Sequence, residues 1–534
     1  MISVELTFQN FVIYSALLAL TWRLLKLLAK SPLDNLPGPP SPSIFSGNIK
    51  QFRPQAWAFH QNIADTYGHV VKYHGLGNQA QIWVSDPKAL HYIVVKDQDS
   101  YDPNIHFRKA MFGEGLLGTR GKQHRKQRKM LNPVFNPRHL QEMVPIFHSV
   151  SHKLRDTISS KVEAGPQEID MLHWFGRTAL ELVGQSGLGY SFDHLDHRPP
   201  HPYGPSIKNL IPTVFRLPIL QRLIPYVDGL GSPAFRRAIV KLIPFADVKS
   251  AREMVDLMDK TSHEIVRSKE SSNLVANEEV GGGKDIMSIL SNANKAAAEE
   301  DRLPDAEVIA QVSTMVFAAT DTTSSALSRI FHLLAQDPEA QGRLRDEIRA
   351  ARSQDGDLDY KQLDALEYLD AVIRETVRLY APIPFMERTA NKDTVLPFSQ
   401  PIVGIDGTDI SEVAIPKGTK VTVAVMRANR DPEIWGDDAQ EWKPERWLAS
   451  SPDKVANVHF PGVYSNMMTF SGGSRACIGF KFSLLEMKVL MCVLLESFAF
   501  SLSDQDIIWN LGAIVTPSVN GSVKPQLPLI VSKV

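Results

Sequence analysis

The sequence predicts one large, mainly α-helical domain with small β-sheets, which follows an N-terminal membrane anchor. Helical patterns dominate from Arg120 to about Ala390, and short strand-and-turn segments lie before and after this region. An uncharged run near the N-terminus leads into a proline-rich segment. The 534 residues, of which 43% are hydrophobic and 22% charged, are enough to bury a large core. No segment repeats with a period of about 20 to 50 residues, which excludes a solenoid.

The overall charge and the cysteine content exclude two classes of protein. A net charge of −1 gives no global field that would favour binding to nucleic acid. Two cysteines in a chain of this length do not make a disulfide framework. They indicate a reducing compartment, or chemistry at one of the two thiols.

We expect residues 1–30 to form an uncleaved membrane anchor. The run Phe11–Trp22 carries no charge, and a membrane-spanning helix needs roughly 20 apolar residues. The leucines that follow complete the span if the side chains of Arg23 and Lys26 reach back to the interface. A cleaved signal peptide would carry its positive charge first, whereas Glu5 comes first here. The positive charges after the run keep the rest of the chain cytosolic. The alternatives are a buried helix and a signal peptide.

The segment 31–43 is expected to be a stiff hinge between the anchor and the domain. Four prolines lie between Pro37 and Pro42, and such a segment cannot be helical. Proline-rich linkers are extended and semi-rigid. We therefore place a single domain at residues 44–534.

Strand and helix patterns follow in order along this domain. Lys72–Pro87 predicts a hairpin, because a short strand, a glycine turn and a second strand follow one another. Residues 394–425 predict further short strands with turns. Phe482–Leu495 predicts one long apolar helix, and Leu511–Val519 a last hairpin.

The loop "FSGGSRACIG", Phe470–Gly479, places one of the two cysteines in an unusual setting. The Cys477 thiolate would be a soft metal ligand, and haem iron is one of the metals that thiolates bind. Three features favour deprotonation: glycines that let backbone amides approach, the charge of Arg475, and the start of a helix. Cys492 lies instead in an apolar helix, where a cysteine is a small core residue.

This loop resembles the haem-binding signature of the cytochrome P450 family, F-x-x-G-x-R-x-C-x-G. The five signature positions are Phe470, Gly473, Arg475, Cys477 and Gly479. The resemblance implies the cytochrome P450 fold, haem b as cofactor, and Cys477 as the axial ligand of its iron. The alternative is a buried structural cysteine in a glycine turn.

A second motif resembles the Glu-Arg-Arg triad of that family. Glu375 and Arg378 are three residues apart, so they share one helix face. Arg446, in "PERW", supplies the third member. The resemblance implies a role in folding and haem retention rather than in chemistry. The alternative is a surface ion pair, since such pairs are common.

"FAATDTTSS" resembles the oxygen-activation motif of the family, A-G-x-D-T-T. Asp321 and Thr322 interrupt an apolar helix, and Ala318 leaves room beside a flat cofactor. A threonine hydroxyl there can bond to the carbonyl one turn earlier. Ala319 stands where glycine is usual. By resemblance Asp321 relays protons and Thr322 positions a water molecule; the alternative is a bend in a threonine-rich helix.

The basic run Arg120–Lys129 has six Lys or Arg in ten residues. His124 and Arg128 share a helix face, where the family often has W-x-x-x-R in contact with a haem propionate. A histidine also donates a hydrogen bond. Arg388 and Arg475 resemble further propionate ligands, because buried carboxylates require clustered cations. The outward-facing charges would suit an acidic electron donor: Lys122, Arg125, Lys126 and Lys129. The alternative is a solvated basic face.

The resemblance covers Leu36 to the C-terminus, with the motifs in the order of the family. The anchor, the proline segment and "PERW" indicate a eukaryotic microsomal member. The sequences around the basic run and the cysteine loop resemble those of family members from filamentous fungi. This implies a monooxygenase in the endoplasmic reticulum membrane with a cytosolic catalytic domain. Electrons from NADPH would arrive through NADPH–cytochrome P450 reductase or cytochrome b5, and one atom of O2 would enter a lipophilic substrate.

Other activities of the same family stay open. A member that uses or rearranges peroxides often lacks the Asp321–Thr322 pair. A desaturase or multistep oxidase would use the same residues. A non-catalytic haem-binding membrane protein would need neither a proton relay nor a docking face.

The substrate is expected to be apolar. The pocket candidates are apolar, which favours a hydrophobic guest: Leu117, Phe317, Ala318, Phe385 and Ile514. The same residues are suited to a protein core. We expect a terpenoid or another secondary metabolite, with a fatty acid or a xenobiotic as alternatives.

Overall fold

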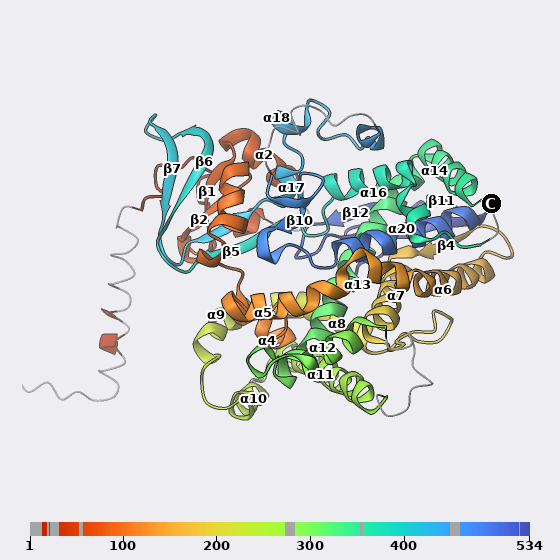
Figure 1. Ribbon diagram of the computed structural model, residues 1–534. Helices are drawn as coiled ribbons and strands as arrows, with labels where there is room; N and C mark the ends of the chain where they lie inside the picture. Colours follow the sequence, from red (N-terminus) through yellow and green to blue (C-terminus); the bar gives the residue numbers. More distant parts are fainter. Residues whose placement is uncertain are drawn as a thin grey trace, which may run out of the picture.

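The structure is a computed structural model that describes residues 13–15, 17–18, 21, 31–52, 57–272, 284–352, 356–448, 460–522 and 524–534 (Figure 1). The predicted anchor, residues 1–30, lies outside the described residues except for six positions. In the described part of the chain, no helix combines the length and the apolar character needed to cross a membrane.

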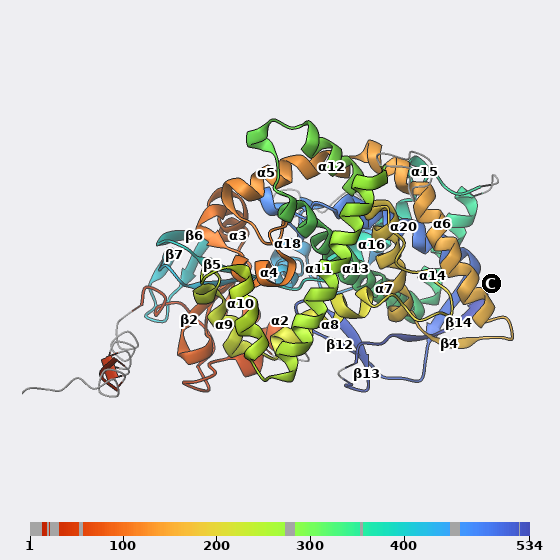
Figure 2. The same ribbon diagram turned by 90° about the horizontal axis from the view of Figure 1, so that it is seen from below.

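The long helix α13 (Asp305–Gln336) runs through the middle of the molecule (Figures 1 and 2). It begins after Pro304, with Asp305 and Glu307 in its first turn, where carboxylates favour a helix N-terminus. Among the helices that contact it are α7 (Met171–Leu182), α8 (Tyr203–Phe215), α11 (Ala246–Ser272), α16 (Glu367–Leu379) and α20 (Phe480–Ser497). The domain is therefore mainly helical, as the sequence predicts.

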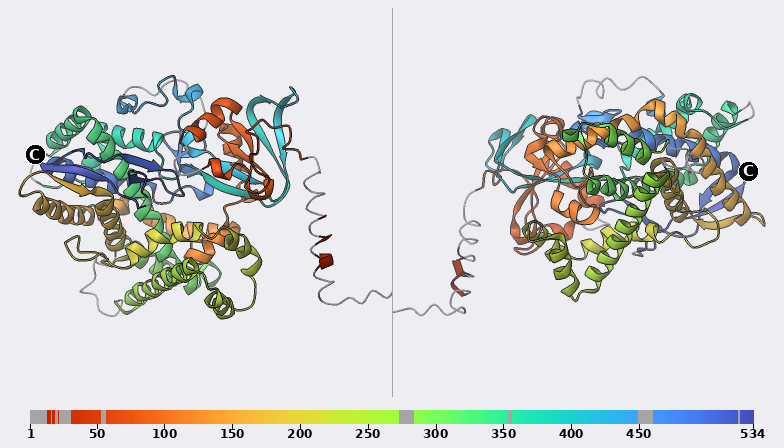
Figure 3. Two further views of the ribbon diagram at one scale, coloured as in Figure 1. Left: turned by 180° about the vertical axis from the view of Figure 1, so that it is seen from behind. Right: turned by 60° about the horizontal axis from the view of Figure 1, so that its bottom comes forward.

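Shorter helices cover this centre. Helix α6 (Pro137–Lys161) begins with a proline and is capped by the side chain before it. The side-chain oxygen of Asn136 accepts a hydrogen bond from the His139 amide at 2.9 Å. The others that matter below are α2 (Trp57–Tyr67), α4 (Ile105–Phe112), α5 (Gly121–Leu131), α9 (Pro218–Val227), α10 (Pro233–Leu242) and α17 (Val425–Ala428). Figure 3 shows α9 and α10 at the outer edge of the molecule.

The largest sheet has five strands in the order β1-β2-β8-β5-β3. The predicted hairpin consists of β1 (Val70–His74) and β2 (Ala80–Val84), which pair antiparallel. Strand β8 (Lys420–Val423) runs parallel to β2, and β5 (Met386–Ala390) joins it to β3 (Tyr101–Asp102). This sheet sets the position of Arg388 beside the start of α4.

The remaining strands form four small sheets. They are β6 (Thr394–Val403) with β7 (Asp409–Ile415), β9 (Gly462–Tyr464) with β10 (Met467–Gly472), β12 (Ile507–Asn510) with β13 (Thr516–Val519), and β4 (Gln167–Asp170) with β14 (Pro528–Lys533) and β11 (Phe498–Leu502).

The segment 31–43 differs from the expected hinge. Leu33 and Leu36 are buried in the core, and the Lys72 amide donates to the Pro37 carbonyl at 2.8 Å. A side chain at Gly38 would overlap the Lys72 carbonyl, so the two backbones meet closely. Burial of its two leucines makes this segment part of the folded domain rather than a free spacer.

The last hairpin begins earlier than predicted. Its strands are β12 and β13, and residues 511–515 form the connection between them. The connection bonds to its surroundings, because the Val515 amide donates to the Pro382 carbonyl at 2.8 Å. The Ser325 hydroxyl of α13 donates to the Val515 carbonyl at 2.5 Å. These two bonds hold the connection beside the middle of α13.

Candidate functional site

The cysteine loop presents a single thiol between β10 and α20. The Cys477 amide donates to the Phe470 carbonyl at 2.9 Å, which closes the loop. Gly473 has a φ of 66°, and a side chain there would lie 2.0 Å from the Val94 carbonyl oxygen. Only glycine fits this position. Ala476 is buried, whereas the neighbouring Cys477 is exposed.

The thiol of Cys477 faces an internal space. Its side chain is exposed, yet burial raises the pKa of Cys477. The two observations agree if the protein encloses a space that no side chain fills. The Gly479 amide and the charge of Arg128 lower the pKa of the thiol, but less than burial raises it. Deprotonation is thus left to a bound metal ion, which favours the thiolate directly.

Arg128 supplies the cation beside the thiol. Its Nη1 donates to the Ala476 carbonyl at 2.5 Å, directly before Cys477. The sequence had suggested Arg475 for this role, but the Nη2 of Arg475 donates to the Thr119 carbonyl at 2.5 Å. The difference arises because α5 passes alongside the loop and brings Arg128 closer to the sulfur.

The middle of α13 also carries side chains that the protein leaves uncovered. Ala318 is exposed, although Val316 and Thr320 on the same helix are buried. Thr322 is half-buried, and its Oγ1 donates to the Ala318 carbonyl at 2.6 Å. This is the bond to the preceding turn that the sequence predicts. Asp321 is half-buried beside it, and burial raises the pKa of Asp321 while Lys208 of α8 opposes the shift.

Helix α20 brings the cysteine loop and α13 together. The Glu486 side chain of α20 is buried and faces Thr323, the residue after Thr322. Burial raises the pKa of Glu486 well above its usual value, and the Thr323 hydroxyl opposes the shift. Because α20 begins three residues after Cys477, we infer that the thiol and the exposed face of α13 border the same space.

The basic residues predicted to hold propionates gather at one edge of this site. Burial and the charges of Arg108 and Arg475 lower the pKa of Arg388 to about 9. Burial and Arg108 lower the pKa of Arg475 to about 10. Burial, then Arg475 and Arg128, lower the pKa of His124 to about 3, so its ring is neutral. Mutual repulsion of this kind indicates that the groups lie close together.

These cations fit a ligand with two carboxylates. Among the described residues, Arg128, Arg388 and Arg475 form no ion pair with a carboxylate. Buried cations without counter-ions are costly. The two propionates of haem would supply the missing negative charge, and the thiol of Cys477 would supply a ligand for its iron. The residues present therefore fit haem.

The Glu-Arg-Arg residues form a buried network. Arg378 donates to both carboxylate oxygens of Glu375, at 2.8 and 2.7 Å, and neither side chain has exposed surface. The Nε of Arg446 donates to the same carboxylate at 3.3 Å, and its Nη1 to Asp438 at 2.7 Å. Trp447 adds a bond from its Nε1 to Glu375 at 3.0 Å. The network joins α16 to the segment that precedes the cysteine loop.

The pocket candidates do not all meet at this space. Phe317 stacks on Phe112 of α4, with ring centres 4.4 Å apart. Leu117 is partly buried against the main core, and Ile514 lies half-buried in the β12–β13 connection. Phe385 stacks on the buried ring of His60, 4.9 Å away.

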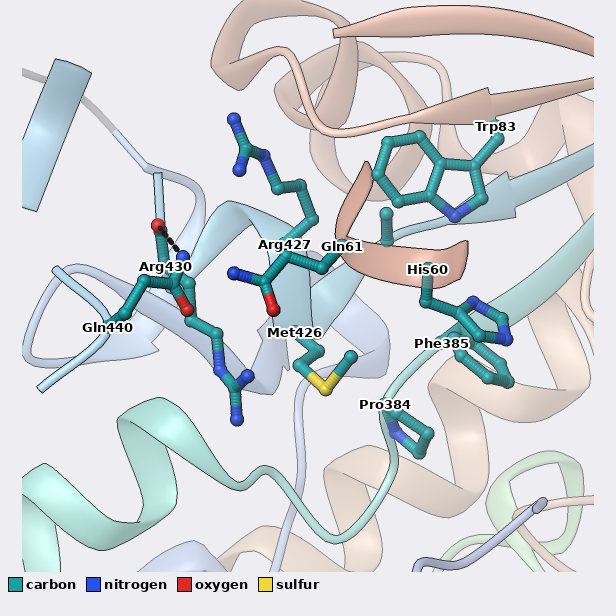
Figure 4. A pocket seen from close by; sticks show the side chains of 10 residues that line it. His60, Gln61, Trp83, Pro384, Phe385, Met426, Arg427, Arg430 and Gln440 are labelled. Atoms are coloured by element: carbon teal, nitrogen blue, oxygen red, sulfur yellow. Dashed lines mark hydrogen bonds between the residues drawn. The ribbon is translucent and has the colours of Figure 1, made fainter. Parts of the chain in front are cut away.

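Phe385 belongs to a separate small pocket between α2 and α17. Figure 4 shows the ring of Phe385 below His60, with Pro384, Met426 and Trp83 also lining the pocket. Phe385 also packs against the cluster of Met426, Trp509, Leu511 and Val515, so its place in the substrate pocket stays a prediction. The neutral ring of His60, whose pKa burial lowers to about 4, offers it a stacking partner.

Two groups of potential metal ligands are explained by ion pairs. His152 bonds to Asp357 at 2.8 Å, and Asp357 also pairs with Arg352 at 3.3 Å. Arg155 contacts the other nitrogen of His152 at 3.0 Å. The second group, around His69, consists of contacts of 3.4 and 3.5 Å to two acidic residues. Neither group needs a metal ion.

Three residues near the site were missed by sequence reasoning: Arg108, Lys208 and Glu486. Each belongs to no motif, and Arg108 looks like its neighbour Lys109 in the sequence. Only the packing of α4, α8 and α20 against the site distinguishes them from ordinary helix residues.

Comparisons with known proteins agree with this geometry. The family model Cytochrome P450 matches residues 37–525. Cytochrome P450 monooxygenase 91 of Postia placenta is 48% identical over 519 residues, which cover 96% of each chain. Cytochrome P450 monooxygenase 212 of the same fungus is 47% identical over 532 residues, covering 97% of this chain and 98% of the relative. A ganoderic acid synthetase of Ganoderma lucidum is 41% identical over 518 residues, covering 94% of each.

Proposed function

Because the chain belongs to the cytochrome P450 family and is a cytochrome P450 monooxygenase, we propose that it inserts one atom of O2 into a lipophilic small molecule. The observation that carries this proposal is the Cys477 thiol, which is exposed although burial raises its pKa; we infer that it borders the same internal space as Ala318 and Thr322. A thiol ligand, with a small exposed side chain and a threonine hydroxyl nearby, suits haem-thiolate chemistry.

The residues around the thiol would hold the haem, which when bound supplies the activation of O2 with electrons from NADPH. Cys477 would ligate the iron, and Arg128 with the Gly479 amide would favour its thiolate form. Arg388, Arg475 and neutral His124 would bind the propionates. The buried Glu375 network would stabilise the segment that precedes the cysteine loop and so fix the position of the loop.

Asp321 and Thr322 would carry protons to the site. Burial raises the pKa of Asp321, so its carboxyl can hold and release a proton nearer neutral pH than an exposed carboxyl can. The Thr322 hydroxyl donates to the Ala318 carbonyl, which leaves its oxygen lone pairs to accept from a water molecule. The pair thus positions a proton donor and a water beside the space.

We propose a terpenoid or another secondary metabolite as the substrate, and hydroxylation as the reaction. The apolar side chains of Phe317, Phe112 and Ile514 near α13 support a hydrophobic guest. A relative at 41% identity is named for ganoderic acid, a terpenoid. Fatty-acid or xenobiotic hydroxylation, and multistep oxidation or desaturation, would use the same residues. A non-catalytic haem-binding membrane protein is the alternative from another class.

We further propose that the protein sits on the endoplasmic reticulum membrane with its catalytic domain in the cytosol. Apolar side chains on and beside α9 and α10 are exposed, Tyr226 and Leu242 each by 82%. Such surfaces mark interaction with a membrane or a partner. The sequon Asn520-Gly521-Ser522 would then carry no glycan. A glycan at Asn520 would contradict this orientation.

The electron donor is proposed to be NADPH–cytochrome P450 reductase or cytochrome b5, docking on α5. Lys122, Arg125 and Lys129 are exposed there. Lys126 is less available, because its Nζ donates to the carbonyls of Glu300 and Arg302 at 2.7 Å. An acidic donor would meet this face through the exposed three.

The test is oxygen incorporation with reductase, NADPH and isotopically labelled O2. A triterpene, dodecanoic acid and a neutral xenobiotic would be offered in parallel. We expect one labelled oxygen atom in a triterpene product and none with Cys477→Ala. A product that forms with peroxide alone, or labels only from water, would contradict the proposed reaction. Turnover of only dodecanoic acid or the xenobiotic would replace the terpenoid proposal.

A further inference from the structure

Arg329 is a buried arginine in the C-terminal half of α13 and belongs to none of the motifs described above. Only 8% of its surface is exposed. Its guanidinium carbon lies 3.5 Å from the ring centre of Trp509 in β12 and 4.1 Å from that of Tyr380. The ring centre of Trp57, the first residue of α2, lies 5.9 Å away. Three aromatic rings thus lie around one cation, and we call Trp57, Tyr380 and Trp509 the aromatic box.

The rings attract the charge of Arg329 but leave its donors without acceptors. An aromatic face attracts a cation, whereas the N–H groups of a guanidinium lie in its plane and need an acceptor there. The Nε of Arg329 is buried and has no partner. Across the described residues, its guanidinium donates no hydrogen bond and pairs with no carboxylate. Buried donors and charges without partners are costly.

A second buried arginine shares the box. Arg430 is 9% exposed, and its guanidinium carbon lies 4.9 Å from the ring centre of Tyr380 and 5.6 Å from that of Trp57. Its Nε and Nη2 donate to the Leu379 carbonyl, which is a neutral acceptor. Burial lowers the pKa of Arg329 well below its usual value, and the charge of Arg430 lowers it further while Tyr380 opposes the shift. Two like charges therefore lie close together in one buried box.

This arrangement differs from that of the other arginines next to aromatic rings. In the described ranges, each of the others also has a carboxylate partner: Arg177 with Asp193, Arg343 with Glu445, Arg374 with Asp370, and Arg378 with Glu375. The two arginines that share the aromatic box have none within the part of the chain that the structure describes. The protein thus places a negative partner beside a stacked arginine everywhere except here.

The pocket between α2 and α17 adjoins the box and has room for one small ion. Arg430 lines it (Figure 4), and so does Met426, which packs with Trp509 in one apolar cluster. Its volume of about 10 Å³ suffices for a ligand of the size of a water molecule. Arg427 lines the pocket too, but its guanidinium points away from that of Arg430 in Figure 4 and pairs with Asp65 at 2.6 Å.

We propose that a small monovalent inorganic anion, chloride, binds at this pocket and is the counter-ion that Arg329 and Arg430 lack. A halide ion is spherical and accepts N–H bonds from several directions at once. The apolar and aromatic walls lower the local dielectric constant, which strengthens its attraction to the two guanidinium groups. Trp509 of the box also donates to His332 of α13 at 3.0 Å. The anion therefore stabilises the attachment of the β12–β13 hairpin to α13.

The test measures thermal unfolding of the full-length protein while chloride replaces gluconate at constant ionic strength. Gluconate is too large for the pocket, so only chloride can bind there. We expect the unfolding temperature to rise and then to level off, by about 1–2 °C at a chloride concentration about ten times the dissociation constant. The line width of the ³⁵Cl nuclear magnetic resonance signal reports chloride binding independently of unfolding.

The variants assign this response to the two arginines. Arg329→Gln removes one of the two charges and should abolish both the rise in unfolding temperature and the excess ³⁵Cl line width that saturates in the wild type. Arg430→Gln removes the other charge and serves as the second variant, so the assignment does not depend on the folding of one protein. The control is Arg343→Gln, because Arg343 also lies over an aromatic ring, at 3.9 Å, but has Glu445 as its partner.

The inference is wrong if the wild type unfolds at the same temperature with and without chloride, which is the result expected for a water molecule in the pocket. It is equally wrong if Arg329→Gln and Arg430→Gln keep the saturable chloride response of Arg343→Gln. Neither result depends on the thiolate ligand, so the proposed function stands or falls separately on its own spectrum.

Discussion

The Arg128 guanidinium bonds to the carbonyl of Ala476, 2.5 Å away, and so lies beside the Cys477 thiol. Burial raises the pKa of Cys477, and within the described part of the chain Arg128 is the one side-chain charge that opposes the shift. The contact places Arg128 beside the thiol, in addition to its predicted role at the propionates.

Replacing Arg128 by Gln should therefore weaken the thiolate. We expect a larger fraction of the reduced, carbon-monoxide-bound protein to show the unshifted Soret band of a haem without a thiolate. The control is Arg125→Gln, which removes an exposed charge paired with Asp99 at 3.0 Å on the same helix. Equal spectra for the two variants would contradict the role of Arg128 at the sulfur.

The Glu375 network should control stability rather than chemistry. Glu375→Gln leaves Arg378 buried without its charge partner and leaves Arg446 paired with Asp438 alone, and breaking a buried pair costs about 3–5 kcal/mol. Thermal unfolding should occur at a markedly lower temperature, with loss of haem. Glu445→Gln is the control, because Glu445 and Arg343 form a half-exposed pair, 2.7 Å apart, worth at most about 1 kcal/mol. Similar unfolding temperatures for both variants would refute the account.

Asp321 should determine how the rate depends on pH. Burial raises the pKa of Asp321, so its protonated form persists to higher pH than in an exposed carboxyl. Activity should fall as the pH rises through this raised pKa, because the proton donor is lost. Asp321→Asn should lower kcat by about 100-fold and abolish this limb of the pH profile. A variant that keeps the limb would show that another group titrates.

The Thr322 hydroxyl should couple NADPH consumption to product. Thr322→Val keeps the shape of the side chain but removes the hydroxyl, so we expect NADPH to be consumed with release of peroxide instead of product. Thr322→Ser keeps the hydroxyl and should stay close to wild type. The ratio of product formed to NADPH consumed measures the effect. Equal ratios for Thr322→Val and Thr322→Ser would show that the hydroxyl does not couple the two.

Glu486 should make the protein less stable as the pH rises. Burial raises its pKa well above the usual value, so the folded state holds a proton that the unfolded chain releases above about pH 4.3. Stability is therefore lost as the pH rises from that value towards the folded pKa. Glu486→Gln should raise the unfolding temperature increasingly over this range. A difference that does not change with pH would contradict a protonated Glu486.

Local motifs account for what the sequence could predict. Cys477, Glu375, Arg378 and Thr322 lie in short patterns whose spacing reflects one helix face or one loop. The helical domain and the β1–β2 hairpin follow from periodicity in the same way. These features depend on neighbours in the chain, so the sequence alone contains them.

Contacts between distant segments could not be predicted. The bond from Arg128 to Ala476 joins residues 348 positions apart. The ring of Phe385 stacks on that of His60, which belongs to a distant segment of the chain. The burial of Leu33 and Leu36 converts a proline-rich segment from a spacer into part of the core.

The central claim is that the Cys477 thiolate holds a haem iron. The most direct test is the carbon-monoxide difference spectrum of the dithionite-reduced protein, with Cys477→Ala and the control Cys492→Ala, which removes a buried core thiol. We predict a strongly red-shifted Soret band in the wild type and in Cys492→Ala, and its loss in Cys477→Ala. A spectrum without haem, or one that Cys477→Ala leaves unchanged, would contradict the claim.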